Sequence, residues 1–331
     1  PNVGVVAVPD SRLSQITEFI KPQKVIPTIV EFVDIAGLVK GASKGEGLGN
    51  QFLGNIRQVG AIVHVVRCFE DDNIIHVDGD INPKRDIETI ETELALADLE
   101  SVLKRKDKNE KIFKSSDKKA VDLAKSLAPI YEKLAETLNQ GKAARSIGLS
   151  EEEIEAIKDL HLITLKPQVY CCNVNEDDIQ GENKYVQAVR QIAKENDSEV
   201  VVICGKLESE IAGLDTAEEK REFLQDMGLE ESGLDKLIRK GYELLKLKTY
   251  FTAGEKEVRA WTFPEGSTAP EAAGVIHTDF EKGFIKAEVY HCTDLFQLGS
   301  EQKIKEAGKL RIEGREYIVK DGDVMHFRFN V

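Results

Sequence analysis

Three short polar segments of this sequence have residue types that together could bind and hydrolyse a nucleoside triphosphate. Asp34 ends the first of them, after an apolar run, and a carboxylate at a strand end can hold a magnesium ion through water. Gly37 follows three residues later and lacks a Cβ, so its N–H can come close to a phosphate. D-x-x-G alone is also the pattern of an ordinary turn, so these residues need partners elsewhere in the chain.

The other two segments follow later apolar runs and could recognise a base. Asn173-Val174-Asn175-Glu176 offers an amide and a carboxylate, which can bind donors and acceptors on a purine edge. Cys204-Gly205-Lys206 follows the next apolar run and could pack close to the base. Each segment alone is also compatible with a plain loop. Their order along the chain, after Asp34, is the order that a Ras-like domain requires.

Alternating strands and helices are expected around these segments. The apolar runs predict strands at 3–8, 28–33, 61–68, 168–172 and 200–204, with helices at 11–20, 50–58 and 185–196. This alternation favours an α/β domain with a mainly parallel sheet, which binds ligands at the carboxyl ends of its strands. The glycine-rich loop 41–49 could order around a γ-phosphate and relax after hydrolysis.

Two further regions differ from this pattern. Apolar residues at helical spacing between 94 and 161 predict a helical hairpin or coiled coil inserted into the α/β domain. Its lysine-rich stretch 104–119 is either a solvated turn or a contact for an acidic partner. From about residue 248 the chain reads as a small β-rich domain. There, Asp321-Gly322 predicts a hairpin between strands at 315–320 and 324–329.

Composition excludes several classes of protein. The net charge of −14 argues against attraction of the whole surface to nucleic acid, although it allows a local basic patch. No apolar run approaches the roughly 20 residues of a membrane helix, and no signal peptide opens the sequence. We therefore expect a cytoplasmic protein. The five cysteines include no C-x-x-C pair, so buried thiols are expected rather than metal ligands or disulfides.

Longer stretches resemble one family, the YchF or Obg-like ATPases of the TRAFAC class of P-loop NTPases. Residues 32–53 are similar to the switch II region of that family nearly letter for letter, and 65–70 also match. Residues 249–254 and 321–327 resemble the two ends of its TGS domain, a β-grasp module. The resemblance covers essentially the whole chain. It implies an α/β fold: a Ras-like P-loop NTPase domain, an inserted helical coiled-coil domain and a C-terminal β-grasp (TGS) domain. The boundaries we predict are 1–93 with 165–247, then 94–164, then 248–331.

The same resemblance implies an activity. It implies a switch protein that prefers ATP over GTP, hydrolyses it slowly with Mg²⁺, and acts on the ribosome or RNA, with no membrane or DNA partner. Asn173 to Glu176 match the position of the GTPase N-K-x-D motif, and the longer Glu176 side chain goes with adenine in this family. Leu38 stands where many relatives carry a water-orienting Gln, and an apolar side chain cannot orient the attacking water. The resemblance thus assigns catalysis to Asp34, Gly37 and Leu38. The oligomeric state is not predicted.

One expected motif is missing from the sequence. It contains no G-x-x-x-x-G-K-[S/T], the phosphate-binding P-loop. Pro1-Asn2-Val3-Gly4 resembles the family's segment just after switch I, which implies that the first strand, the P-loop and the switch I threonine precede Pro1. An alternative interpretation is a non-catalytic adaptor for the ribosome or RNA with a degenerate nucleotide site. A Rossmann-type oxidoreductase is a third, and it would need a dinucleotide at residues 45–50.

Overall fold

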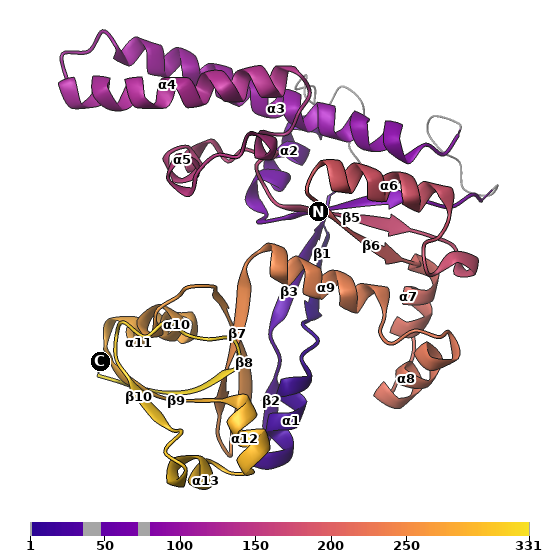
Figure 1. Cartoon of the computed structure of the whole chain (residues 1–331), viewed down its shortest axis with the longest axis vertical. Coiled ribbons are helices and arrows are strands. Elements are labelled where there is room, and N and C mark those ends of the chain that lie inside the picture. Colours follow the sequence, from indigo (N-terminus) through magenta and orange to yellow (C-terminus); the bar gives the residue numbers. More distant parts are fainter. Residues whose placement is uncertain (1, 36–47, 72–79, 331) are drawn as a thin grey trace. The chain divides into compact units, whose positions relative to one another are not determined.

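The computed structural model describes residues 2–35, 48–71 and 80–330 (Figure 1). The chain divides into two compact units. Unit 1 consists of Pro1–Asn2 and Val33–Leu237, and unit 2 of Val3–Phe32 and Ile238–Val331. The three predicted domain boundaries do not coincide with this division and stay a prediction.

A parallel sheet of three strands forms the centre of unit 1. In the order β4 (Ile62–Arg67), β5 (Gln168–Asn173) and β6 (Glu199–Ile203), the strands pair in parallel, with β5 in the middle. Every residue of β5 before Asn173 is buried, as expected for a central strand covered on both faces. Tyr170 and Cys172 of β5 pack against Val186 and Val189 of α6 (Lys184–Glu195). The strands and the helix predicted here are confirmed.

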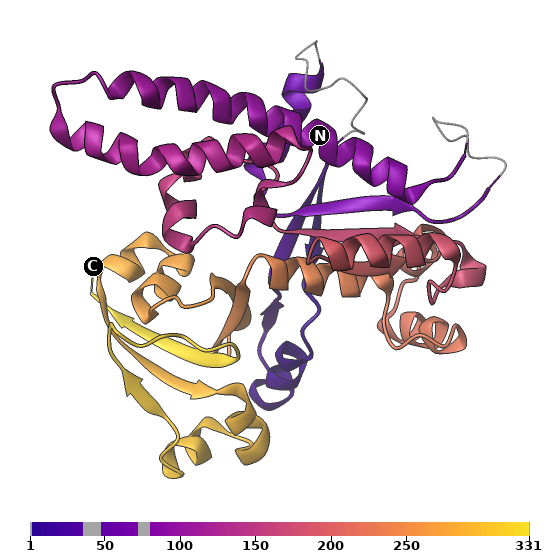
Figure 2. The ribbon, with the colours of Figure 1, turned by 45° about the horizontal axis from the view of Figure 1, so that its top comes forward.

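A long helical hairpin is inserted between β4 and β5. Its two arms are α3 (Pro83–Ile112) and α4 (Lys118–Asn139), which lie side by side and are joined by a short loop (Figure 2). Ala95 and Val102 of α3 pack with Tyr131 and Leu134 of α4, and all four are buried. The predicted hairpin is therefore confirmed. The other helices of unit 1 are α2 (Leu48–Gln58), η2 (Ala144–Ile147), α5 (Glu151–Ala156), η3 (Lys158–Leu160), η4 (Glu176–Asp178), α7 (Gly205–Ala212) and α8 (Ala217–Asp226), and α9 (Gly233–Leu244) runs into unit 2.

The first strands of the chain do not join the β4-β5-β6 sheet. β1 (Asn2–Ala7) and β3 (Ile29–Asp34) pair with each other in a separate two-stranded sheet. Among the described residues, the strands predicted for one parallel sheet therefore lie in two separate sheets.

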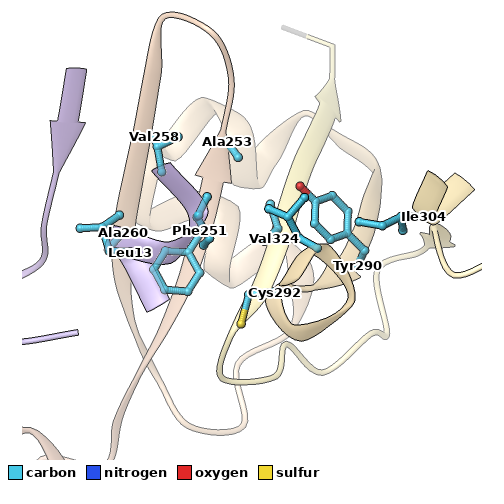
Figure 3. Packing of buried hydrophobic residues seen from close by; sticks show 11 residues of the cluster. Leu13, Phe251, Ala253, Val258, Ala260, Tyr290, Cys292, Ile304 and Val324 are labelled. Atoms are coloured by element: carbon cyan, nitrogen blue, oxygen red, sulfur yellow. The ribbon is translucent and has the colours of Figure 1, made fainter. Parts of the chain in front are cut away.

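Unit 2 is built around a six-stranded sheet in the order β10-β9-β11-β7-β8-β2. Its strands are β2 (Lys24–Ile26), β7 (Leu247–Ala253), β8 (Glu257–Pro264), β9 (Phe284–His291), β10 (Arg311–Glu313) and β11 (Asp323–Phe329). Its helices are α1 (Ser11–Ile20), α10 (Ala269–Ile276), α11 (Thr278–Lys282), α12 (Cys292–Leu298) and α13 (Glu301–Glu306). On one face, Leu13 of α1 packs with Phe251, Ala260, Tyr290 and Val324 of the strands (Figure 3). The segment Val3–Phe32 thus completes the core of this unit.

The predicted hairpin around Asp321-Gly322 is wrong. Residues 315–320 form no strand apart from an isolated bridge between Ile318 and Thr268, and β11 pairs with β9 and β7 instead. Gly322 has a φ of 91°, so the chain does turn at this dipeptide. However, Asp321 accepts a hydrogen bond from the N–H of Thr249 at 2.9 Å, which directs the turn toward β7 rather than into a local hairpin.

Candidate nucleotide site

The side chain of Asn173 links the loops that follow β5 and β6. Its Oδ1 accepts a hydrogen bond from the N–H of Gly205 at 3.0 Å. Gly205 is the first residue of α7, whose N-cap residue Cys204 makes no side-chain capping bond. The oxygen from the neighbouring strand therefore satisfies one of the free N–H groups at the start of this helix. Two of the three predicted polar segments are brought together by this bond.

The backbone around Asn173 is held on both sides. Its carbonyl accepts from the N–H of Cys68 at 2.8 Å, and the N–H of Val174 donates to the carbonyl of Ile203 at 2.9 Å. Val174 and Cys204 are both buried in the core beneath these loops. Because strand pairing and burial fix this backbone, the Asn173 side chain is presented in a defined position.

Glu176 and Lys206 form an ion pair across the same two loops. The distance between Glu176 Oε2 and Lys206 Nζ is 2.6 Å, and both side chains remain largely exposed. The carboxylate raises the pKa of Lys206 through this hydrogen bond. Since the pair is open to solvent, either group can exchange its partner for a polar ligand at little cost.

The loop after β4 also contacts the loop after β5. No residue pattern in the sequence had predicted this contact. Asn175 Nδ2 donates to the carbonyl of Glu70 at 3.4 Å, and Asn183 Nδ2 donates to the carbonyl of Cys68 at 2.8 Å. The hydroxyl of Tyr185 donates to the Glu70 carboxylate, and this bond lowers the pKa of Glu70. The only signal in the sequence was the family resemblance of 65–70, because no local pattern shows that this loop meets the loop after β5.

A pocket of about 420 Å³ lies between these loops and the start of α6. It is lined by Cys68, Phe69, Glu70, Asn175, Asp177, Asp178, Asn183, Lys184 and Tyr185. Phe69 contributes an aromatic ring, and the guanidinium of Arg67 lies 4.8 Å from the centre of that ring. An aromatic ring next to amide and carboxylate groups is a suitable lining for a planar heterocycle.

Asp34 lies at the end of β3 and is exposed. It belongs to a different sheet from Asn173. The next residue, Ile35, packs against a cluster that contains Leu53, Leu94 and Ile163. This apolar contact anchors the chain directly after the Asp34 carboxylate. The predicted residues Gly37 and Leu38 lie outside the described residues, as does most of the glycine-rich loop.

The described residues contain neither a membrane-spanning helix nor a cluster of metal ligands. No helix in this part of the chain is long and apolar enough to cross a membrane. Within residues 2–35, 48–71 and 80–330, no three His, Cys, Asp or Glu side chains gather to hold a metal ion. All five cysteines are free and buried, as predicted.

Comparisons with known proteins agree across nearly the full length of the chain. A family model named YchF-GTPase_C, described as a protein of unknown function (DUF933), matches residues 247–330. A relative from Pasteurella multocida (strain Pm70), named Ribosome-binding ATPase YchF, is 57% identical over 331 residues, which are 100% of this chain and 90% of the relative. A protein of the same name from Bacillus subtilis (strain 168) is 55% identical over 333 residues, with the same coverage. The solved structure of the Schizosaccharomyces pombe YchF GTPase matches with a TM-score of 0.89 and 40% identity, covering 99% of this chain and 88% of that one.

Proposed function

Because this chain belongs to the YchF family, we propose that it binds ATP in preference to GTP, hydrolyses it slowly and acts on the ribosome. The names of the relatives support an ATPase that binds ribosomes. The single observation that carries the nucleotide site is the 3.0 Å hydrogen bond between Asn173 and Gly205. This bond joins the two loops that would hold a base, and it does so at the carboxyl edge of a parallel sheet, where α/β folds bind ligands.

The proposed preference for adenine depends on Glu176. Its carboxylate can accept a hydrogen bond from the exocyclic amino group of adenine, whereas guanine presents a carbonyl oxygen at the same position. Lys206 holds the carboxylate by the 2.6 Å contact described above. An aspartate would be one methylene shorter, so its carboxylate would lie in a different position and the discrimination between bases should change.

Asp34 is the residue that we propose for Mg²⁺. A site built from several protein carboxylates would not suit this ion, because magnesium usually keeps several waters and binds one or two carboxylates together with substrate phosphates. One exposed carboxylate at a strand end, followed by the anchored Ile35, fits that requirement. When bound, the ion would neutralise charge on the phosphates, and the role of Asp34 is to orient its water ligands.

Slow turnover is proposed from Leu38. An apolar residue at that position cannot orient an attacking water, so basal hydrolysis should lie in the range of unassisted Ras-like enzymes, on the order of 10⁻³ to 10⁻⁴ per second. Ribosomes should then accelerate the reaction, if they supply the missing group.

The central test is a titration of the purified protein with ATP and GTP, together with the variant Glu176→Asp. We expect the original chain to bind ATP more tightly than GTP. In Glu176→Asp the ratio of the ATP affinity to the GTP affinity should fall by about tenfold, which corresponds to one altered polar contact. Equal affinities of the original chain for the two nucleotides would contradict the proposed preference. Binding of neither would favour the non-catalytic adaptor.

A second test addresses the metal. Asp34→Asn should lower Mg²⁺-dependent ATP hydrolysis about a hundredfold, because the side chain loses its charge but keeps its shape. Binding of ATP in the presence of a chelator should stay unchanged, and this measurement serves as the control. If hydrolysis by Asp34→Asn matches that of the original chain, Asp34 does not serve the metal.

A further inference from the structure

The free end of the α3–α4 hairpin carries an excess of positive charge. Residues 104–125 contain nine lysines and arginines against four aspartates and glutamates, a net charge of +5. The whole chain has a net charge of −14. The charge of this stretch is therefore opposite to that of the protein as a whole.

Most of these cations are exposed and lie near the loop. Every residue of 110–119 is exposed. We define the cationic tip as Lys108, Lys111, Lys114, Lys118, Lys119 and Lys125, all of which are exposed. The cations nearer the base of the hairpin, Lys104, Arg105 and Lys106, are paired with carboxylates. For the six lysines of the tip, the described chain shows no such ion pair, so their charges face solvent.

Specific contacts hold the tip in shape. Asn109 is buried, and its Nδ2 donates to the carbonyl of Ala124 at 2.7 Å, which fastens α3 to α4. Asp117 Oδ1 accepts from the N–H groups of Lys119 and Ala120 at 3.0 and 3.3 Å and so caps the start of α4. Five of the six tip lysines therefore extend from the two helices, and Lys114 extends from the turn between them.

Apolar side chains are exposed beside these cations. Ile112 and Phe113 end α3 with 38% and 39% of their surface exposed, and Leu123 of α4 is 61% exposed. A surface that only solvates a turn does not need them. Lysines next to exposed apolar and aromatic groups are suited to a ligand that offers both phosphates and flat, less polar surfaces.

Distance separates the tip from the acidic part of the hairpin. Glu91 and Lys111 are twenty residues apart on α3, which is about 30 Å along the helix axis. Charges in water are screened over about 8 Å at physiological salt. The carboxylates around Glu91 therefore do little to cancel the attraction of the tip for an anionic partner.

From these observations we propose that the cationic tip binds the phosphate backbone of RNA, and specifically ribosomal RNA. This proposal rests on the proposed association with the ribosome. The lysines neutralise phosphates, while Phe113 and Ile112 pack against sugars or bases. Uniform negative charge along a stiff chain matches the spread of the six lysines over two helix ends better than one acidic side chain would.

The experiment compares two variants of the whole chain that remove equal charge. The tip variant combines Lys111→Gln, Lys114→Gln, Lys118→Gln and Lys119→Gln. The control variant combines Lys194→Gln, Lys256→Gln, Lys282→Gln and Lys305→Gln, which are exposed lysines outside the hairpin. Binding to purified ribosomes and to free ribosomal RNA is measured from low salt to about 0.2 M salt, and thermal unfolding confirms that both variants are folded.

We expect the tip variant to bind ribosomes and RNA at least about tenfold more weakly at physiological salt, because up to four phosphate contacts are lost. The slope of log K against log salt should become shallower by about 3, or 0.7 to 0.9 per lost contact. The control variant should keep both values, and both variants should bind ATP like the original chain.

Three results would overturn the proposal. If the tip variant binds ribosomes and RNA like the original chain, the tip is not the RNA contact, although the association with the ribosome stands. If the original chain binds neither, the association with the ribosome fails too, while the ATP titration still decides the nucleotide site separately. If the original chain binds polyglutamate or anionic vesicles but not RNA, and the tip variant loses that binding, the partner is of another class.

Discussion

Asn173 makes the contact on which the candidate nucleotide site most depends. The side chain accepts a hydrogen bond from Gly205 at the start of α7, its carbonyl accepts from Cys68 directly after β4, and the next residue, Val174, donates to Ile203 of β6. The end of β5 is thus held from both neighbouring strands. Such support matters because a base-binding amide is useful only if its position is fixed before the ligand arrives.

Removal of this side chain should weaken nucleotide binding. Asn173→Ala loses the hydrogen bond to Gly205 and leaves the loop after β6 without its link, so we expect ATP affinity to fall by about fivefold to tenfold. Asn175→Ala is the matched control, because Asn175 bonds to Glu70 at the longer distance of 3.4 Å. Calorimetric titration with ATP compares the affinities of the two variants. A larger loss of affinity in Asn175→Ala would show that Asn175, and not Asn173, is the more important amide.

For single residues, the sequence predicted which residue types belong to the candidate site but not which residues they contact. The polar residues at the ends of β5 and β6 could be predicted, because they follow apolar runs directly. The contribution of Cys68, Glu70 and Asn183 could not, since their contacts join segments more than 100 residues apart. The candidate residues Gly37 and Leu38 stay predictions.

At the scale of elements, the sheet of unit 1 contains a titratable group that is not part of the candidate site. His64 of β4 packs against Tyr170 of β5, with ring centres 5.6 Å apart. Removal from water lowers the pKa of His64 from its ordinary 6.5 to about 4, an effect that the nearby Glu91 partly opposes. The histidine is therefore neutral in the folded protein at pH 5, whereas it is mostly charged in the unfolded chain.

The stability of this sheet should consequently depend on pH between about 6.5 and 4. The unfolded chain binds the proton more readily in this window, so the free energy of unfolding falls as the pH drops through it. We expect His64→Phe, which keeps a ring against Tyr170, to reduce the loss of stability between pH 7 and pH 5 by about 1 to 2 kcal/mol. Urea unfolding at both pH values measures this, and identical pH dependence in the two proteins would contradict it.

Element prediction succeeded where the pattern was long and failed where it was short. The helical spacing that begins at Leu94 and Ala97 identified α3, in which both residues are buried, although the helix starts earlier, at Pro83. The dipeptide Asp321-Gly322 predicted a local hairpin, but a two-residue pattern cannot show which strand pairs with the segment that follows the turn. Contacts from Thr249 and Arg12, which are distant in sequence, decide its direction.

At the scale of the whole molecule, unit 2 is closed by a contact between the two ends of the chain. Nη1 of Arg12 on α1 lies 2.8 Å from Asp321 Oδ2, and the same guanidinium pairs with Asp10. Burial raises the pKa of Asp321, but hydrogen bonds from Arg12 and the N–H of Thr249 outweigh it, so this pKa lies below its usual value. No local sequence pattern could have predicted that Val3–Phe32 belongs with the last third of the chain.

Loss of this link should destabilise unit 2. We expect Arg12→Gln to lower its free energy of unfolding by about 1 to 2 kcal/mol, a value reduced from that of a fully buried charged bond because Asp321 is partly exposed. Arg328→Gln removes an ion pair with Glu288 that is more exposed, and should cost less than about 0.5 kcal/mol. The loss of stability caused by Arg12→Gln should disappear as the pH falls below 3.8, because Asp321 must be ionised to contribute to the ion pair. Unfolding followed by the fluorescence of Trp261 tests both variants, and equal effects would show that the link is unimportant.

The pairing of β2 with β8 also means that one strand is synthesised long before its partner. Val25 lies opposite Val258 in the sheet, so the earlier strand must wait for 233 more residues before its neighbour exists. At a translation rate of about 5 to 20 residues per second, this delay is about 10 to 50 seconds. During that interval Leu13 and Ile16 of α1 stay exposed, because the strands that bury them have not yet been made. A nascent chain of this protein should therefore expose α1 as a binding site for chaperones until the strands β7 to β11, which pack against it, have been synthesised.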